Sequence, residues 1–134
     1  METFSYLLDT NILSDIIKHP AGAVVEKIAE VGEGTICTSI IVACELRFSA
    51  VKKGSQLLTT RVEQLLERIE VLSLGEKADE YYASLRHDLE KDGALIGPND
   101  LLIAAHALDI GVTLVTDNLR EFTRIKGLSV ENWL

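Results

Sequence analysis

The chain has 134 residues and a mass of 14.7 kDa, the size of one domain with a core of its own. Apolar residues make up 47% and charged residues 25%, which excludes an intrinsically disordered chain. The 21 acidic and 13 basic side chains give a net charge of -8, which argues against a protein that coats nucleic acid through a basic surface. The charge does not exclude an enzyme that meets phosphate groups through bound cations.

The first half of the chain predicts strands that alternate with helices. The apolar run at residues 4–8 predicts a buried strand, and the polar triplet Asp9-Thr10-Asn11 opens a helix that ends before Pro20. The elements expected next are a helix over residues 21–31, a strand over 35–38, a helix from Ser39 through Lys53, a helix after Ser55 and a strand over 71–74.

The second half continues the same alternation. The expected elements are a helix over residues 78–91, a helix from Gly97 to Gly111, a strand over 112–115, a short helix after 116–118 and an edge strand over 128–130. The helix before Gly111 is apolar nearly all round, so we expect it at the centre of the fold. The alternation predicts an α/β fold with a parallel sheet covered on both faces. No linker or repeat divides the chain, so we expect a single domain over residues 1–134.

Targeting signals and metal-ligand spacings are both missing from the sequence. The first five residues lack the basic and apolar regions of a signal peptide, and no apolar run approaches the ~20 residues that span a bilayer. We therefore expect a cytoplasmic protein without a membrane partner. Cys37 and Cys44 match no zinc or disulfide pattern and are expected to be buried thiols. His19, His87 and His106 also lack metal spacing, and His106 is expected in the core, hydrogen-bonded to backbone.

Four acidic residues occupy positions where an α/β sheet binds ligands. Ligands bind outside the carboxyl ends of the strands in such sheets. Asp9 follows the first expected strand and Asp117 follows the fourth, while Asp100 lies in the first turn of the central helix. Glu45 lies in the helix after the second strand. We expect these four carboxylates at the same edge of the sheet.

Three of the four acids also have a purely structural explanation. Asp9 could cap the helix that follows it, and Asp100 could simply favour the positive end of its helix dipole. Asn118 and Glu121 have the spacing of a capping box, which would make Asp117 a turn residue. These alternatives remain open for each residue taken singly.

Glu45 has no such simple explanation. Its neighbours at helical spacing are Ile41, Val42, Phe48 and Ser49, and none of them is cationic. A carboxylate on an apolar helix face must be paired, coordinated or neutralised. Carboxylates about 4 Å apart repel by roughly 4 kcal/mol per pair at an effective dielectric near 20. If the four acids converge, a hard divalent cation such as Mg²⁺ or Mn²⁺ would remove that repulsion.

The ordered set of motifs resembles the PIN-domain ribonucleases, and in particular the VapC toxins of bacterial toxin–antitoxin pairs. The matching motifs are L-L-D-T-N-I at residues 7–12, E-L at 45–46, G-P-N-D at 97–100, I-A-A-H-A at 103–107, V-T-D-N-L-R-E-F at 115–122, and G-L at 127–128 with E-N-W at 131–133. The resemblance spans essentially the whole chain. It implies a three-layer α/β/α sandwich with a short parallel sheet of four to five strands, and a metal-dependent endoribonuclease activity.

The resemblance also implies roles for individual residues. It makes Asp9, Glu45, Asp100 and Asp117 the catalytic and metal-binding acids around Mg²⁺ or Mn²⁺, which would hold a metal-activated water for phosphodiester hydrolysis. It places Asn11, Thr116 and Asn118 in the pocket or its water shell. The fourth acid is present here, so the set is complete.

The same resemblance implies partners. It predicts a homodimer, an RNA substrate with tRNA favoured, and a VapB-like antitoxin whose tail blocks the active site. The antitoxin would carry a DNA-binding domain, so that the complex assembles on operator DNA.

Two other functions remain as alternatives. The first is a catalytically silent PIN subunit that binds its antitoxin and tunes repression of the operon. The second is a receiver-like signalling domain, which would require adjacent acids near the first strand and a lysine after a late strand. Asp9 stands alone and Lys126 follows an expected helix, so this pattern matches poorly.

Overall fold

The computed structural model describes residues 3–134 and shows a parallel five-stranded sheet between two layers of helices. Met1 and Glu2, which belong to the segment that predicts no signal peptide, lie outside the described residues. The elements are β1 (Tyr6–Leu8), α1 (Thr10–Lys18), α2 (Ala23–Val31), the 3-10 turn η1 (Glu33–Thr35), β2 (Ile36–Ser39), α3 (Ile40–Lys53), α4 (Gln56–Arg68), β3 (Glu70–Leu72), α5 (Ala78–Lys91), α6 (Pro98–Ile110), β4 (Thr113–Val115), α7 (Leu119–Phe122) and β5 (Val130–Glu131).

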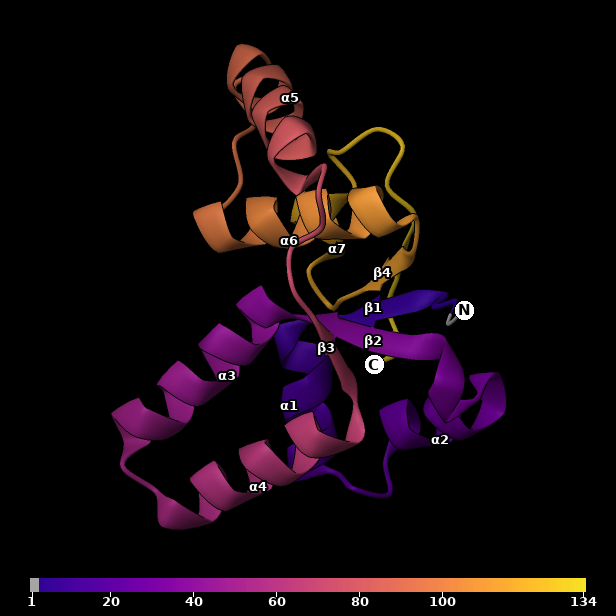
Figure 1. Ribbon diagram of the computed structural model, residues 1–134, viewed down its shortest axis with the longest axis vertical. Coiled ribbons are helices and arrows are strands. Elements are labelled where there is room, and N and C mark those ends of the chain that lie inside the picture. Colours follow the sequence, from indigo (N-terminus) through magenta and orange to yellow (C-terminus); the bar gives the residue numbers. More distant parts are fainter. Residues whose placement is uncertain (1–2) are drawn as a thin grey trace.

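The order of the strands sets the position of the site. The sheet runs β3-β2-β1-β4-β5, so the chain leaves β1 toward one edge and later returns to the other side of β1 as β4. Helices α1–α4 fill the lower half of Figure 1, and α5–α7 lie above the sheet. The order therefore reverses between β1 and β4, and the crevice at such a reversal is where α/β sheets bind ligands. The expected α/β fold with a covered parallel sheet is confirmed.

Side-chain caps explain why several elements begin and end where they do. Ser39 closes β2 and caps α3, accepting a hydrogen bond from the Ile41 backbone N–H at 3.1 Å. β3 consequently ends at Leu72, the partner of Ser39, rather than at residue 74 as the sequence predicts. Gly54 ends α3 in the left-handed conformation, with φ of 62°, as expected of a helix-terminating glycine.

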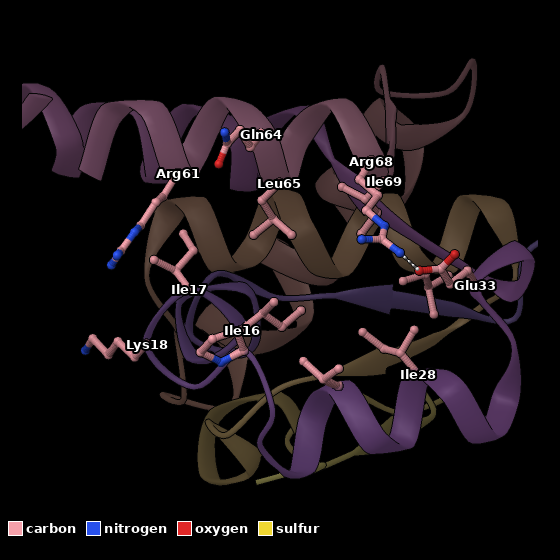
Figure 2. A pocket seen from close by; sticks show the side chains of 13 residues that line it. Ile16, Ile17, Lys18, Ile28, Glu33, Arg61, Gln64, Leu65, Arg68 and Ile69 are labelled. Carbon is pink, nitrogen blue, oxygen red and sulfur yellow. Dashed lines mark hydrogen bonds and ion pairs between the residues drawn. The ribbon is translucent and has the colours of Figure 1, made fainter. Parts of the chain in front are cut away.

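A groove lies between α1, α2 and α4 (Figure 2). It has a volume of about 610 Å³ and is lined by apolar side chains that include Ile16, Ile28 and Leu65. Its rim is basic and carries Lys18, Arg61 and Arg68, the last of which pairs with Glu33 at 2.9 Å. This basic rim contrasts with the net charge of -8 of the chain.

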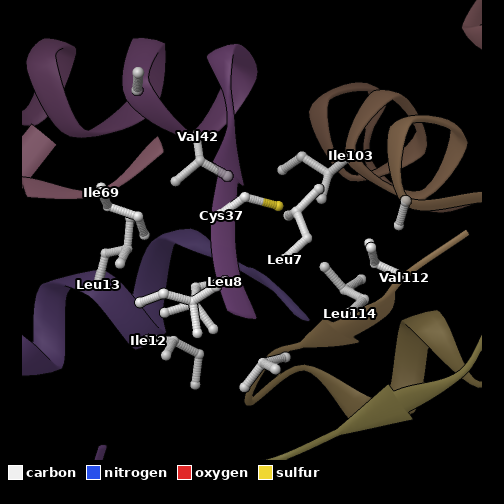
Figure 3. Packing of buried hydrophobic residues seen from close by; sticks show 14 of the residues in the cluster. Leu7, Leu8, Ile12, Leu13, Cys37, Val42, Ile69, Ile103, Val112 and Leu114 are labelled. Atoms are coloured by element: carbon white, nitrogen blue, oxygen red, sulfur yellow. The ribbon is translucent and has the colours of Figure 1, made fainter. Parts of the chain in front are cut away.

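The hydrophobic core lies on both faces of the sheet. Leu7 and Leu8 of β1 are fully buried and point to opposite faces, Leu8 toward Leu13 of α1 and Leu7 toward Ile103 of α6 (Figure 3). Six residues of α6 are buried, which confirms the prediction of a central helix. They are Leu101, Ile103, Ala104, Ala105, His106 and Ala107.

The two cysteines differ in burial, which corrects one expectation. Cys37 lies in β2 and is buried, but Cys44 is exposed. Cys44 lies off the stripe of α3 that contains the buried residues Val42, Leu46 and Ala50, and it therefore faces away from the core. In the described part of the chain, no helix has the length and apolar character needed to cross a membrane.

Candidate active site

Asp9 lies at the point where β1 and β4 separate. Its backbone N–H donates to the Val115 carbonyl at 2.9 Å, which extends the pairing of β1 with β4 by one residue. The residue is only 6% exposed, and its carboxylate accepts two hydrogen bonds at 2.8 Å, from the Thr10 N–H and from Thr116 Oγ1. Asp9 is therefore the N-cap of α1, one of the roles expected from the sequence, and it also follows directly after the carboxyl end of β1.

Thr116 and Asn11 orient two of the predicted acids. Thr116 is fully buried, and its hydroxyl donates to Asp9 while accepting the Asn118 backbone N–H at 3.0 Å. The Asn11 Nδ2 donates to Asp117 Oδ1 at 3.0 Å, which joins α1 to the loop after β4. Both contacts link residues more than a hundred positions apart in the chain. The two strand ends therefore form one site.

Glu45 reaches from α3 to the first residue of α1, next to Asp9. Thr10 Oγ1 donates to Glu45 Oε1 at 2.7 Å, and the Glu45 side chain is partly buried. The nearby Arg47 forms a two-pronged ion pair with Glu63 instead, at 2.8 and 2.9 Å. Among the ion pairs found within residues 3–134, none involves Glu45. The Glu45 carboxylate therefore accepts a hydrogen bond from a hydroxyl group and forms no ion pair within residues 3–134.

Asp100 completes the cluster from the first turn of α6. Burial raises its pKa to about 7, helped by a hydrogen bond with the Glu121 side chain and by the negative charges of Asp9, Glu121 and Glu45. The pKa of Asp9 is raised as well. Burial raises its pKa, the hydrogen bonds from Thr116 and Thr10 oppose this rise, and Glu45 and Asp117 add to it. These electrostatic effects link Asp9 to Glu45, Asp100 and Asp117, and Asp100 also to Glu45.

Glu121 is a fifth acid of the site, and the sequence analysis missed its role. The capping-box interpretation is wrong, because the Asn118 side chain makes no cap to α7 and instead donates its Nδ2 to Glu121 Oε2 at 2.9 Å. The carboxyl group of Glu121 is therefore turned toward Asp100. The one available signal was nearness in the sequence, since Glu121 follows Asp117 by four residues.

The donor set fits a hard divalent cation. All five acids offer carboxylate oxygens, the ligands that Mg²⁺ and Mn²⁺ prefer. Within residues 3–134, no three His, Cys, Asp or Glu side chains are close enough to enclose a metal by themselves. Mg²⁺ commonly keeps several waters and uses one or two carboxylates, so this spacing is compatible with its binding. The raised pKa values of Asp9 and Asp100 indicate carboxylates that a cation would stabilise.

Comparison with known proteins identifies the family. The model of the PIN domain family matches residues 6–128. Ribonuclease VapC2 of Rickettsia felis is 42% identical over 132 residues, which cover 96% of this chain and 97% of the relative. The chain belongs to the VapC ribonucleases of the PIN-domain family. The tRNA(fMet)-specific endonuclease VapC of Shigella flexneri is 35% identical over 129 residues, covering 96% of this chain and 97% of that protein.

Solved structures agree with this VapC assignment. The complex of VapBC2 from Rickettsia felis with a fragment of its promoter DNA contains a chain that superposes with a TM-score of 0.90. That chain is 36% identical, and the match covers 98% of this VapC-family chain and 100% of the other. DNA-bound VapBC from Salmonella typhimurium gives a TM-score of 0.88 at 33% identity, with coverage of 98% and 100%. Lys126, which a receiver-like domain would need after a strand, follows α7 in this VapC fold.

The histidines of this VapC-family chain lie away from the acids. His19 and His87 are exposed, and His19 lies 3.9 Å from Asp15. His106 is a buried core residue, as expected, and its Nδ1 lies 2.7 Å from the Ser39 hydroxyl, while a backbone hydrogen bond with Ser73 acts to raise the pKa of the ring. None of the three is a candidate metal ligand.

Proposed function

We propose that this chain is a Mg²⁺- or Mn²⁺-dependent endoribonuclease and the toxin of a toxin–antitoxin pair, with residues 1–134 as a single PIN domain. The observation that carries the proposal is a chain of carboxylates beyond the carboxyl ends of β1 and β4 that raise the pKa values of Asp9 and Asp100, with no ion pair to any of them among residues 3–134. The chain's relatives carry ribonuclease names. Because one of them is named as a tRNA(fMet)-specific endonuclease, we propose tRNA as the substrate class.

The metal-holding residues in this proposal are Asp9 and Asp100, and Glu45 and Asp117 complete the set. A bound Mg²⁺ or Mn²⁺ would lower the pKa of water and neutralise the charge that develops on the phosphodiester. Asp9 is preorganised, since its two oxygens are fixed by separate hydrogen bonds. Thr10 fixes the oxygen Oε1 of Glu45 in the same way. These contacts hold the acids in place before the substrate arrives.

Three polar residues orient the acids rather than binding the metal. Thr116 holds Asp9 through its hydroxyl, and Asn11 holds Asp117 through its amide. Asn118 donates to Glu121 Oε2 at 2.9 Å, which leaves the carboxyl of Glu121 beside Asp100. With its pKa raised to about 7, the Asp100 carboxyl would be partly protonated near neutral pH, and a bound cation would favour its ionised form.

The direct test replaces a single acid and measures RNA cleavage. Asp9→Asn and Asp100→Asn should each abolish cleavage of tRNA and growth inhibition, while circular dichroism shows an intact fold. Asp88→Asn, an exposed position on α5 outside the cluster, is the matched control and should cleave like the wild type. Full cleavage by either site variant, or undiminished wild-type cleavage in excess EDTA, would refute the mechanism. A wild type that binds antitoxin and cleaves no RNA would instead support the catalytically silent alternative.

The antitoxin is the proposed occupant of both the site and the groove. Structures similar to this chain are toxin–antitoxin complexes, two of them bound to DNA. Helix α1 connects the two places, because Asn11 near its start lies at the acids and Ile17 near its end lines the groove. Its nine residues span about 13 Å, a distance that four or five residues of extended chain can cross. The antitoxin would place apolar residues with acidic neighbours in the basic-rimmed groove and a basic residue at the acids.

Substitutions that introduce a charge into the groove should separate antitoxin binding from RNA cleavage. Leu65→Asp in the groove should abolish co-purification with the antitoxin while RNA cleavage persists. Leu57→Asp, on the same helix but 60% exposed and outside the groove lining, is the matched control. Unchanged antitoxin binding by Leu65→Asp would refute the docking proposal. We further propose a homodimer that assembles with its antitoxin on operator DNA, and light scattering after gel filtration tests the dimer.

A further inference from the structure

A buried hydrogen bond joins the two helices that carry Glu45 and Asp100. His106 of α6 is fully buried, and its Nδ1 lies 2.7 Å from Ser39 Oγ, 67 residues away in the chain. Ser39 is also fully buried and is the N-cap of α3. His106 follows Asp100 by six residues, and Glu45 follows Ser39 by six residues. This hydrogen bond therefore joins α6 to the start of α3, six residues from Asp100 and from Glu45, and neither carboxylate takes part in it.

The direction of this hydrogen bond follows from what Ser39 already does. Ser39 Oγ accepts the Ile41 backbone N–H at 3.1 Å, and its own hydrogen needs an acceptor. Burial lowers the pKa of His106, opposed by Asp109 and by the Ser73 backbone, so the ring is neutral near pH 7. A neutral ring with its hydrogen on Nε2 leaves Nδ1 free to accept from Ser39. The opposite arrangement would leave the Ser39 hydrogen without an acceptor among the described residues.

Core packing by itself does not account for a histidine at this position. Its Nε2 is buried and has no hydrogen-bond partner of good geometry within residues 3–134, an arrangement that lowers stability. An apolar residue of similar volume would pack here without leaving a ring nitrogen unsatisfied. What the histidine adds is a directional contact, which an apolar side chain lacks. A second buried bond acts nearby, where Thr38 Oγ1 donates to the Leu8 carbonyl at 2.7 Å and ties β2 to β1 beside Asp9.

We propose that His106 is a positioning residue of the site, and that its hydrogen bond to Ser39 sets the separation of Glu45 from Asp100. This inference rests on the proposed ribonuclease function. His106 contacts none of the acids in the hydrogen bonds of the described chain, so it acts through the helices. A small shift of α3 against α6 would misplace two of the carboxylates that hold the cation, and sub-ångström placement matters for catalysis.

The test compares two replacements of the same ring. His106→Leu removes the acceptor, whereas His106→Asn keeps a polar oxygen near the position of Nδ1. We expect His106→Leu to lower kcat for RNA cleavage by about 10- to 100-fold with little change in KM. His106→Asn should recover most of that loss. Mn²⁺ titration by calorimetry, without RNA, should show weaker binding for His106→Leu and near-normal binding for His106→Asn.

Two controls separate positioning from general loss of stability. Val24→Ala removes volume from a fully buried site on α2 and should lower the melting temperature without lowering kcat. If His106→Leu does not fold, Ser39→Gly removes the hydroxyl while glycine still supports the helix start, and Ser39→Thr restores the hydroxyl. The wild-type ring should show its hydrogen on Nε2 in ¹⁵N spectra, and Ser39→Gly should change that signature.

The outcomes distinguish this proposal from the function on which it rests. Wild-type kcat and Mn²⁺ binding in His106→Leu or Ser39→Gly would overturn the positioning role while the ribonuclease proposal stands. A loss in His106→Asn as large as in His106→Leu would also overturn it. If the wild type cleaves no RNA, the ribonuclease proposal fails, and the Mn²⁺ titration still decides whether His106 positions the acids.

Discussion

The raised pKa of Asp100 predicts that the metal-free protein is less stable at pH 8 than at pH 5. A carboxyl group whose pKa is higher in the folded chain binds its proton more tightly there than in the unfolded chain. Low pH therefore favours the folded state, and this contribution is lost as the pH rises from 3.8, the ordinary value, toward about 7. The substitution Asp100→Asn removes the titrating group and with it this part of the pH dependence.

The size of the effect follows from the same pKa. Between pH 5 and a pKa of about 7, the folded chain holds about one proton more than the unfolded chain, and each pH unit contributes about 1.4 kcal/mol. The full effect would be about 3 kcal/mol, and solvent screening of this partly exposed carboxyl reduces it to about 1–2 kcal/mol. For a chain of this length, that loss corresponds to a fall in melting temperature of roughly 3–8 °C.

The assay is thermal unfolding in EDTA at pH 5.0 and 8.0, for the wild type, Asp100→Asn and the control Asp88→Asn. The wild type and the control should lose the additional stability at pH 8, and Asp100→Asn should not. Because the pKa of Asp9 is also raised, a weaker pH dependence of stability should remain in every variant, Asp100→Asn included. Added Mg²⁺ or Mn²⁺ at pH 8 should restore the wild type more than Asp100→Asn, because the cation binds the ionised acid. An equal pH dependence in the wild type and Asp100→Asn would refute the reasoning.

Three further predictions test contacts inside the fold. Thr116→Val should lower the free energy of unfolding by about 1–3 kcal/mol and reduce RNA cleavage, because Asp9 loses a buried hydrogen-bond donor. Thr116→Ser should keep wild-type stability and cleavage, and urea unfolding and a cleavage assay check both variants. In the native protein Cys44 should react with DTNB and Cys37 should not, because burial raises the pKa of the Cys37 thiol to about 12; two fast equivalents per chain would contradict this. Phe122→Ala should reduce the free energy of unfolding by about 3–5 kcal/mol in urea, since the ring is fully buried, and a loss below 1 kcal/mol would contradict its core role.

The elements that sequence reasoning predicted well are those governed by local rules. Ser39 and Ser55 cap α3 and α4 as expected, because a serine before an apolar helix satisfies free N–H groups. The central position of α6 follows from its apolar surface on all sides. The convergence of Asp9 and Asp117 follows from their place after neighbouring strands of a parallel sheet. Each inference needs only neighbouring residues or the alternation of strands and helices.

Other features depend on contacts between distant segments. Cys37 is buried as expected, whereas the exposure of Cys44 depends on which face of α3 packs on the sheet. Glu121 joins the site through its contact with Asp100 of α6, 21 residues earlier in the chain. The bond between Ser39 and His106 spans 67 residues, so no local pattern could have indicated it.

By itself, the sequence determined the alternation of strands and helices, the family resemblance and the four acids near one sheet edge. The tertiary structure decided how those acids are held, which fifth acid joins them, and which of them have raised pKa values. The physical reason is that hydrogen-bond partners such as Thr116 for Asp9, and the desolvation that raises a pKa, arise only when residues far apart in the chain are packed together. The hydrogen bonds and the pKa values of the site therefore depend on tertiary packing.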